Sequence, residues 1–186
     1  MTRWSVVVGA GLLVAACSGA SDGDDDGASL GDTLPATEVT VPDIPAESPP
    51  GTGVVVVGAA VSSFAVTGCQ LDPADAGQLL RVTGAGTTGR GDAFEVEVQR
   101  FSSATAAAET FTDTITYSDT ARILQIQRFE VAGSVTDLRD PDARSTLLRV
   151  RPGGVAAAGL AGPPGTSSGS DRNDDGIVGF ALDLTC

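Results

Sequence analysis

Apolar and polar positions alternate along most of the chain after residue 52, and this alternation predicts β-strands. Residues 93–98 (AFEVEV) carry apolar side chains at every second position, as in a strand buried on one face. Gly, Pro, Asp and Asn fall between such runs and favour turns. The runs that we expect to form strands are 54–57, 64–67, 79–83, 93–98, 110–117, 122–131, 146–150 and 177–185.

Short strands separated by turn residues predict an all-β domain, either a small antiparallel β-sandwich or an open barrel. The alanine-rich residues 103–109 are expected to form a short helix. Residues 84–89 (GAGTTG) fit the G-x-G-x-x-G pattern of dinucleotide sites. Because a strand pattern follows them where a dinucleotide site needs a helix, we expect a glycine loop in a hairpin. A long exposed loop is expected over residues 162–171.

The beginning of the chain has a different pattern. Residues 6–16 form an apolar run after Arg3, which fits a secretory signal peptide and is shorter than the ~20 residues of a membrane span. The run ends in Val14-Ala15-Ala16-Cys17, which resembles the lipobox of bacterial lipoproteins. The resemblance implies that the signal peptide 1–16 is removed and that diacylglycerol is attached to Cys17. The protein would then be anchored at the extracytoplasmic face of the cell membrane.

Residues 17–52 have the composition of a tether. They are rich in Asp, Pro, Gly and Ser and contain no Lys or Arg. Such a segment cannot bury enough apolar surface to offset its chain entropy, so we expect it to be disordered and extended. The folded β-domain is then expected to span residues 53–186.

Cysteine usage agrees with export. The chain has three cysteines, and lipidation of Cys17 would leave Cys69 and Cys186 as a pair in an oxidising compartment. A bridge between them would close nearly the whole domain into a loop. In the chain-entropy model such a bridge contributes at most about 5 kcal/mol. We therefore expect one disulfide, Cys69–Cys186.

The composition argues against several classes of function. The chain has no histidine, so the usual general base and the commonest metal ligand are missing. The G-x-S-x-G match at residues 165–169 therefore lacks the base of a nucleophile elbow. Glu95 and Glu97 alternate with apolar residues and are expected to face solvent. The formal net charge is -13 without a basic stripe, which argues against nucleic acid. We expect no enzymatic activity.

Residues 171–176 (DRNDDG) match the start of an EF-hand calcium loop, D-x-[DN]-x-[DN]-G. Asp171, Asn173 and Asp175 would supply the oxygen ligands. The twelfth position is Leu182 where that loop needs a bidentate Glu, so any Ca²⁺ binding is expected to be weak. The alternative is a tight turn that leads into the last strand, since Asn, Asp and Gly favour turns by themselves.

The layout of the whole chain resembles the mycobacterial lipoprotein antigens of the LpqH type. These combine a lipobox, a low-complexity tether and a small β-domain bridged by two cysteines. The best local matches are Cys69 and the ending 180–186 (FALDLTC), whereas the longer middle, residues 118–142, departs from the family. The resemblance implies a non-enzymatic envelope lipoprotein for surface display or binding. In a pathogen, host innate receptors would recognise its acylated N-terminus.

Two other functions stay open from the residues. One is an envelope lipid or glycolipid carrier, which would need an apolar pocket inside the β-domain. The other is a calcium-dependent adhesion or wall-binding module built around Asp171, Asn173 and Asp175. The partners expected under these hypotheses are the membrane, through Cys17, and a host receptor or an envelope component.

Overall fold

The computed structural model describes residues 39–72, 78–105, 108–131, 134–137, 148–165 and 176–186. These residues form ten β-strands, and none of them is helical. The strands are β1 (Thr52–Val57), β2 (Ala60–Gln70), β3 (Gln78–Thr87), β4 (Ala93–Thr105), β5 (Ala108–Asp119), β6 (Ile123–Val131), β7 (Ser134–Asp137), β8 (Leu148–Arg151), β9 (Gly154–Ala161) and β10 (Val178–Thr185).

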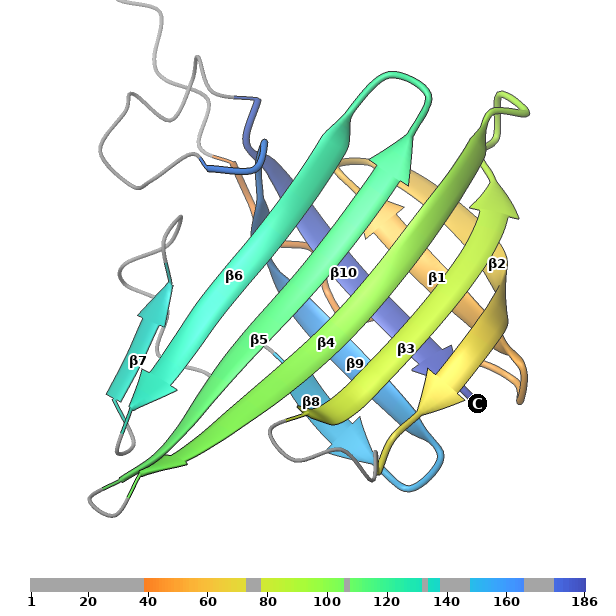
Figure 1. The fold of residues 1–186 in the computed structure, drawn as a ribbon. Helices are drawn as coiled ribbons and strands as arrows, with labels where there is room; N and C mark the ends of the chain where they lie inside the picture. The colour runs from red at the N-terminus through yellow and green to blue at the C-terminus, as the bar shows by residue number, and fades with distance from the viewer. Residues whose placement is uncertain (1–38, 73–77, 106–107, 132–133, 138–147, 166–175) are drawn as a thin grey trace, which may run out of the picture. The chain divides into compact units, whose positions relative to one another are not determined.

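All of these strands belong to one antiparallel sheet, in the order β7-β6-β5-β4-β3-β2-β1-β10-β9-β8. Consecutive strands pair with each other except β7 and β8, which form the two edges of the sheet, and the pairing of β10 with β1 joins the end of the domain to its beginning. The sheet curls into an open barrel (Figure 1). An isolated bridge between Gln125 of β6 and Gly162 after β9 links strands from opposite parts of the sheet. The all-β prediction is confirmed, and of its two alternatives the structure has the open barrel.

Three local predictions differ from the structure. The helix expected at residues 103–109 is wrong, because β4 continues to Thr105 and β5 begins at Ala108, with Ser103 paired to Thr110. A helix this short is marginal, so pairing with a neighbouring strand outweighs its alanine content. The hairpin expected at residues 84–89 is confirmed, but its turn begins later than expected, since β3 runs on to Thr87 and pairs with β4 from Ala93. Strand β9 (GVAAAGLA) was not expected, because Ala and Gly have low β-propensity.

The interior of the curled sheet is apolar and follows the alternation of the strands. On β1, for example, Val55 and Val57 are buried and the residues between them are partly exposed. The most buried large side chains are Phe180, Leu80, Ile115, Leu124, Ile126, Leu148, Leu182 and Leu184. Apolar burial of this kind, at about 25 cal/mol per Å², is the main force that holds the sheet in its curled form.

The ring of Phe64 explains why glycines stand inside the strands. Phe64 on β2 pairs with Gly53 of β1 on one side and with Gly86 of β3 on the other. A Cβ atom at Gly53 or Gly84 would overlap the ring of Phe64. Gly84 and Gly86 of the GAGTTG motif are therefore packing positions, where the missing side chain leaves space for an aromatic ring.

Strand β10 is buried on both faces, unlike the strands in the middle of the sheet. Its inward side chains join the core, and its outward positions are covered by residues 39–50, which we call the N-terminal segment. A Cβ atom at Gly179 would overlap the carbonyl oxygen of Thr40, so the two backbones are in close contact. The compact unit extends over Ala36–Cys186. Residues 39–52, which we expected at the end of the tether, are thus part of the folded unit.

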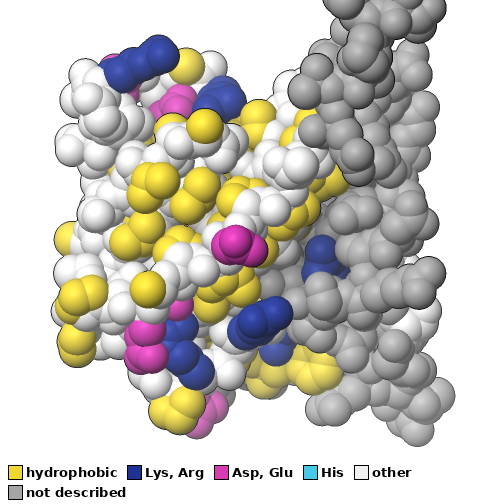
Figure 2. Space-filling model, turned by 180° about the vertical axis from the view of Figure 1, so that it is seen from behind, with side chains coloured by type: hydrophobic (Ala, Val, Ile, Leu, Met, Phe, Trp, Pro, Cys, Tyr) yellow, Lys and Arg dark blue, Asp and Glu magenta, His cyan; other side chains and the backbone are white. Residues whose placement is uncertain are grey.

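Viewed from behind, this half of the molecule presents many apolar side chains across the middle of its described surface (Figure 2). In the N-terminal segment, Val41 keeps 42% of its surface exposed. The cover makes the outer side of β10 a second, smaller packing layer. This second layer accounts for the near-continuous apolar sequence of β10, which alternation alone does not explain.

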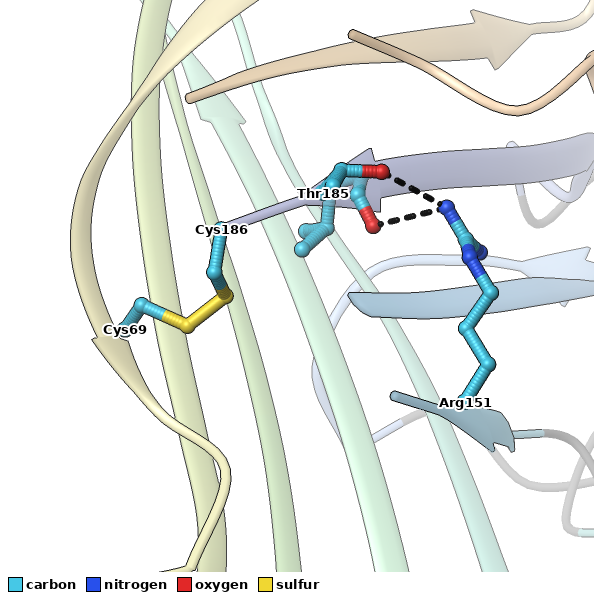
Figure 3. Close-up of a disulfide and its surroundings, with 5 residues drawn as sticks. Cys69, Arg151, Thr185 and Cys186 are labelled. Atoms are coloured by element: carbon cyan, nitrogen blue, oxygen red, sulfur yellow. Dashed lines mark hydrogen bonds between the residues drawn. A yellow bond between two sulfur atoms is a disulfide. The ribbon is translucent and has the colours of Figure 1, made fainter. Parts of the chain in front are cut away.

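The predicted disulfide is confirmed. Cys69 near the end of β2 and Cys186 after β10 are bridged, with their Cα atoms 5.9 Å apart and a sequence separation of 117 residues (Figure 3). Beside it, the guanidinium of Arg151 donates to Thr185 Oγ1 at 2.8 Å and to the carbonyl of Leu184 at 3.2 Å. The C-terminus is therefore fixed covalently to β2 and by hydrogen bonds to β8.

Candidate functional site

The turns after β1, β3 and β5 lie at the same end of the sheet, which we call the mouth (Figure 1). A cavity of about 660 Å³ opens between them. It is lined by Val55, Val57, Ala60, Val61, Ser62, Thr88, Gly89, Arg90, Asp92, Tyr117, Asp119, Thr120, Ala121 and Arg122. The antiparallel order places these turns together, although their residues are far apart in the sequence.

The lining of this mouth cavity has an apolar wall and a charged rim. Val55 and Val57 of β1 are buried, and Tyr117 of β5 is 4% exposed. The rim carries two carboxylates and two guanidinium groups, so its formal charges balance; they belong to Arg90, Asp92, Asp119 and Arg122. An apolar pocket with a few polar groups at its opening is the usual form of a small-molecule site.

Tyr117 and Asp119 form the fixed polar pair of the cavity. The Tyr117 hydroxyl donates to Asp119 Oδ2 at 3.1 Å. Asp119 Oδ1 accepts the backbone N–H groups of Ala121 at 2.8 Å and Arg122 at 2.9 Å. This carboxylate closes the turn between β5 and β6, as Asp side chains do in Asx turns, so the sequence of the turn itself positions the pair.

The pKa values of the pair are shifted in opposite directions. Burial, the hydrogen bond to Asp119 and the charge of Asp119 raise the pKa of Tyr117 to about 12. Burial acts to raise the pKa of Asp119, but the hydrogen bonds from Ala121, Arg122 and Tyr117 outweigh it and lower this pKa below its ordinary value of 3.8. At neutral pH the cavity therefore holds a neutral phenol beside a carboxylate.

Aromatic rings support the wall from below. Phe94 stacks on Tyr117 with ring centroids 5.3 Å apart, and Phe64 meets Phe94 edge to face at 6.2 Å. Such pairs contribute about 1 kcal/mol beyond their burial. The position of Tyr117 is thus fixed by stacking as well as by its hydrogen bond.

Away from the mouth, an ion pair lies inside the barrel. Arg100 donates to both oxygens of Asp113, at 2.6 and 2.8 Å, and its NH2 group also donates to the carbonyl of Leu148 at 3.2 Å. The guanidinium lies 5.4 Å from the ring centroid of Phe111. Asp113 is 3% exposed. The pair is fully engaged in internal bonds, so it has a structural role in this arrangement.

The residues singled out in the sequence have different outcomes. Cys17, proposed for lipid attachment, and Asp171, Asn173 and Asp175, proposed for Ca²⁺, lie outside the described residues. Within the described ranges, no group of three or more His, Cys, Asp or Glu side chains has the spacing of a metal site. No helix in the described part of the chain is long and apolar enough to cross a membrane.

Glu95 and Glu97 lie on the outer face of β4, as the alternation predicted. The Glu97 carboxylate accepts from Arg81 at 2.7 Å and from Gln99 at 2.7 Å. Both carboxylates face away from the mouth cavity and from its tyrosine. The sequence did not indicate the cavity residues, because they come from three separate turns and share no motif.

Comparisons with protein-family models, with curated proteins and with solved structures found no match to this chain.

Proposed function

We propose that this protein is a non-enzymatic, lipid-anchored binding protein of the bacterial cell envelope, and that its mouth cavity binds a small amphiphile. Cys17 would hold it at the extracytoplasmic face of the membrane through diacylglycerol, as the lipobox resemblance implies. The observation that supports ligand binding is the cavity itself. Its volume of about 660 Å³ falls within the ~300–1,000 Å³ of small-molecule sites.

The lining indicates the class of ligand. Val55, Val57 and the ring of Tyr117 offer an apolar wall that suits a single alkyl chain. The rim pairs two Arg with two Asp, which suits a zwitterionic or uncharged head group better than a strongly anionic one. A single-chain lipid with such a head group matches both parts. This choice favours the carrier alternative over pure surface display.

A photoreactive short-chain lysophosphatidylcholine tests the cavity in membranes that contain the full chain. We expect cross-links at the lining residues, since the alkyl chain would lie against β1 and the turn after β5. Ser62→Trp should abolish them by filling the cavity, because Ser62 belongs to its lining. Ser63→Trp is the matched control, as Ser63 is the exposed neighbour on the same strand. Equal cross-linking of the two variants, or cross-links elsewhere, would contradict the proposal.

The anchor is tested separately by the intact mass of the protein extracted from the envelope. We expect a chain that begins at Cys17 and carries diacylglycerol, and a Cys17→Ser variant that lacks the lipid. An unmodified wild-type chain would remove the anchor from the proposal and leave the cavity to be judged by cross-linking alone.

A further inference from the structure

The outer face of β2–β5 carries a second hollow, which is separate from the mouth cavity. This outer groove has a volume of about 370 Å³. It is lined by Thr67, Arg81, Thr83, Gly84, Ala85, Glu95, Val96, Glu97, Thr116 and Ser118. We propose that the outer groove binds an uncharged oligosaccharide or polysaccharide chain.

The register of the sheet explains the hollow. Ala85 of β3 pairs with Glu95 of β4, which pairs with Ser118 of β5. One row further, Thr83 pairs with Glu97, which pairs with Thr116. The small side chains of Ala85 and Ser118 thus stand between the longer ones of β4, and this difference in size produces the groove.

Four of the polar side chains in the lining are already held by hydrogen bonds to each other or to Gln99. Glu97 Oε1 accepts from Arg81 and Gln99, and the hydroxyls of Thr67 and Thr83 lie 3.1 Å apart. This network holds the walls in place before any ligand arrives, which lowers the entropy cost of binding.

The remaining polar side chains of the lining are free to bind a ligand. Within the described residues, the side chains of Glu95, Thr116 and Ser118 make no hydrogen bond or ion pair. A carboxylate accepts hydrogen bonds, whereas a hydroxyl both donates and accepts them. The hydroxyl groups of a sugar complement this set, since each can donate to Glu95 and accept from Thr116 or Ser118.

The charge of the groove excludes anionic polymers. Arg81 is paired with Glu97 at 2.7 Å, so the unpaired charge that remains is the carboxylate of Glu95. The chain as a whole has a formal net charge of -13, which repels nucleic acids and other polyanions. An uncharged polyhydroxylated chain is not repelled by these negative charges. Its binding also requires no charged group of the ligand to be desolvated.

The same face extends beyond the groove and ends in aromatic residues. Phe101 of β4, which is 40% exposed, pairs with Thr112, and Thr112 pairs with Phe129 of β6. From Glu95 to Phe101 the strand covers about 20 Å, at ~3.3 Å per residue. The exposed ring of Phe101, which lies beside hydroxyl groups, gives a flat apolar surface against which the C–H face of a sugar ring can pack. A chain of several sugar units would fit along the strands.

The test is binding of uncharged hexasaccharides of glucose, galactose, mannose and N-acetylglucosamine to the full chain held in nanodiscs, by surface plasmon resonance. We expect at least one to bind. Glu95→Ala should weaken binding about tenfold, the contribution of one charge-assisted hydrogen bond, and Thr116→Val should weaken it about fivefold, the contribution of one neutral hydrogen bond. Glu47→Ala, at an exposed carboxylate outside the groove, is the matched control and should leave binding unchanged.

Binding of none of the four sugars would overturn the proposal, as would equal binding by wild type, Glu95→Ala and Thr116→Val. A preference for a cationic peptide over every sugar would assign the groove to a protein partner and would also overturn it. Ser62→Trp, which fills the mouth cavity, should keep its sugar binding. The outcome is therefore independent of the amphiphile proposal.

Discussion

At the mouth of the barrel, three short turns surround a cavity, and the side chains of Thr88 and Asp119 make short-range hydrogen bonds within their own turns. At the opposite end, which we call the disulfide end, the chain is held by the Cys69–Cys186 bridge and by an arginine–aspartate pair. Both ends belong to the same sheet, yet their long-range links differ. We expect the links of the disulfide end to keep the sheet folded while the mouth stays open.

The links of the disulfide end also fix the N-terminal segment. Asp183 on the outer side of β10 is 2% exposed. Its carboxylate accepts from the backbone N–H of Ser48 at 2.7 Å and from two nitrogens of Arg151 at 2.7 and 3.0 Å. The N-terminal segment is thus bound to the strand that ends at the disulfide.

Asp183→Ala should have the largest effect. It would leave Arg151 without its buried partner and release Ser48, and the removal of one member of a buried ion pair costs about 3–5 kcal/mol. Denaturant unfolding of the full chain measures this loss. Glu47→Ala, which removes an exposed partner of the same arginine at 3.5 Å, should cost less than about 1 kcal/mol. Equal losses for the two variants would show that Asp183 does not hold this end.

Cys69→Ser should cost about 2–5 kcal/mol, because it frees a loop of more than a hundred residues in the unfolded chain. The measurement is the unfolding midpoint in denaturant, with Cys17→Ser as a control that should not move it. At denaturant concentrations where the variant stays folded, cross-linking of the lipid probe at the mouth should persist. Loss of that cross-linking in the folded variant would contradict the independence of the two ends.

Gly84→Ala should cost about 1–3 kcal/mol, since the added methyl group would overlap the ring of Phe64 inside the barrel. Gly89→Ala is the matched control, because nothing lies within 4 Å of its Cβ position. Thermal unfolding of both variants is the measurement. A Gly84→Ala variant as stable as Gly89→Ala would mean that the glycine is not required by the aromatic ring.

The smallest expected effect is the shifted titration of Tyr117, which reports on the mouth alone. It is the single tyrosine of the chain, so tyrosinate absorbance follows one group, with an expected midpoint of about 12 instead of the ordinary 10.0. The raised pKa stabilises the folded state fully below pH 10.0, and this contribution is lost as the pH rises through about 12. Asp119→Asn should lower the midpoint only in part, because burial, the largest cause, remains. A folded-state midpoint near 10 would contradict a buried tyrosine.

The sequence predicted the strands of the middle of the sheet well, because β4, β5 and β6 are buried on one face and alternate accordingly. It did not predict β9, whose alanines and glycines pack between two strands and need no alternation. The sequence analysis assigned residues 39–52 to the tether, and this assignment was wrong. The Pro-rich N-terminal segment packs on β10 through backbone contacts, which leave no hydrophobic pattern in the sequence.

The disulfide was predictable from cysteine number and compartment, whereas neither hollow was. The mouth cavity depends on three turns that the barrel brings together, and the outer groove depends on the register that sets Ala85 beside Glu95. From the sequence alone, Gly84 predicts a loop. Its position in a strand is explained only by the ring of Phe64, which occupies the space of the missing side chain. Long-range pairing was thus the missing information.

Native mass spectrometry of the protein extracted from its cell envelope in mild detergent tests the central claim most directly. The account predicts a non-covalent amphiphile that is retained by wild type and by Ser63→Trp and is absent from Ser62→Trp. A wild-type protein that carries no such ligand, or a ligand retained equally by Ser62→Trp, would contradict a binding site in the mouth cavity.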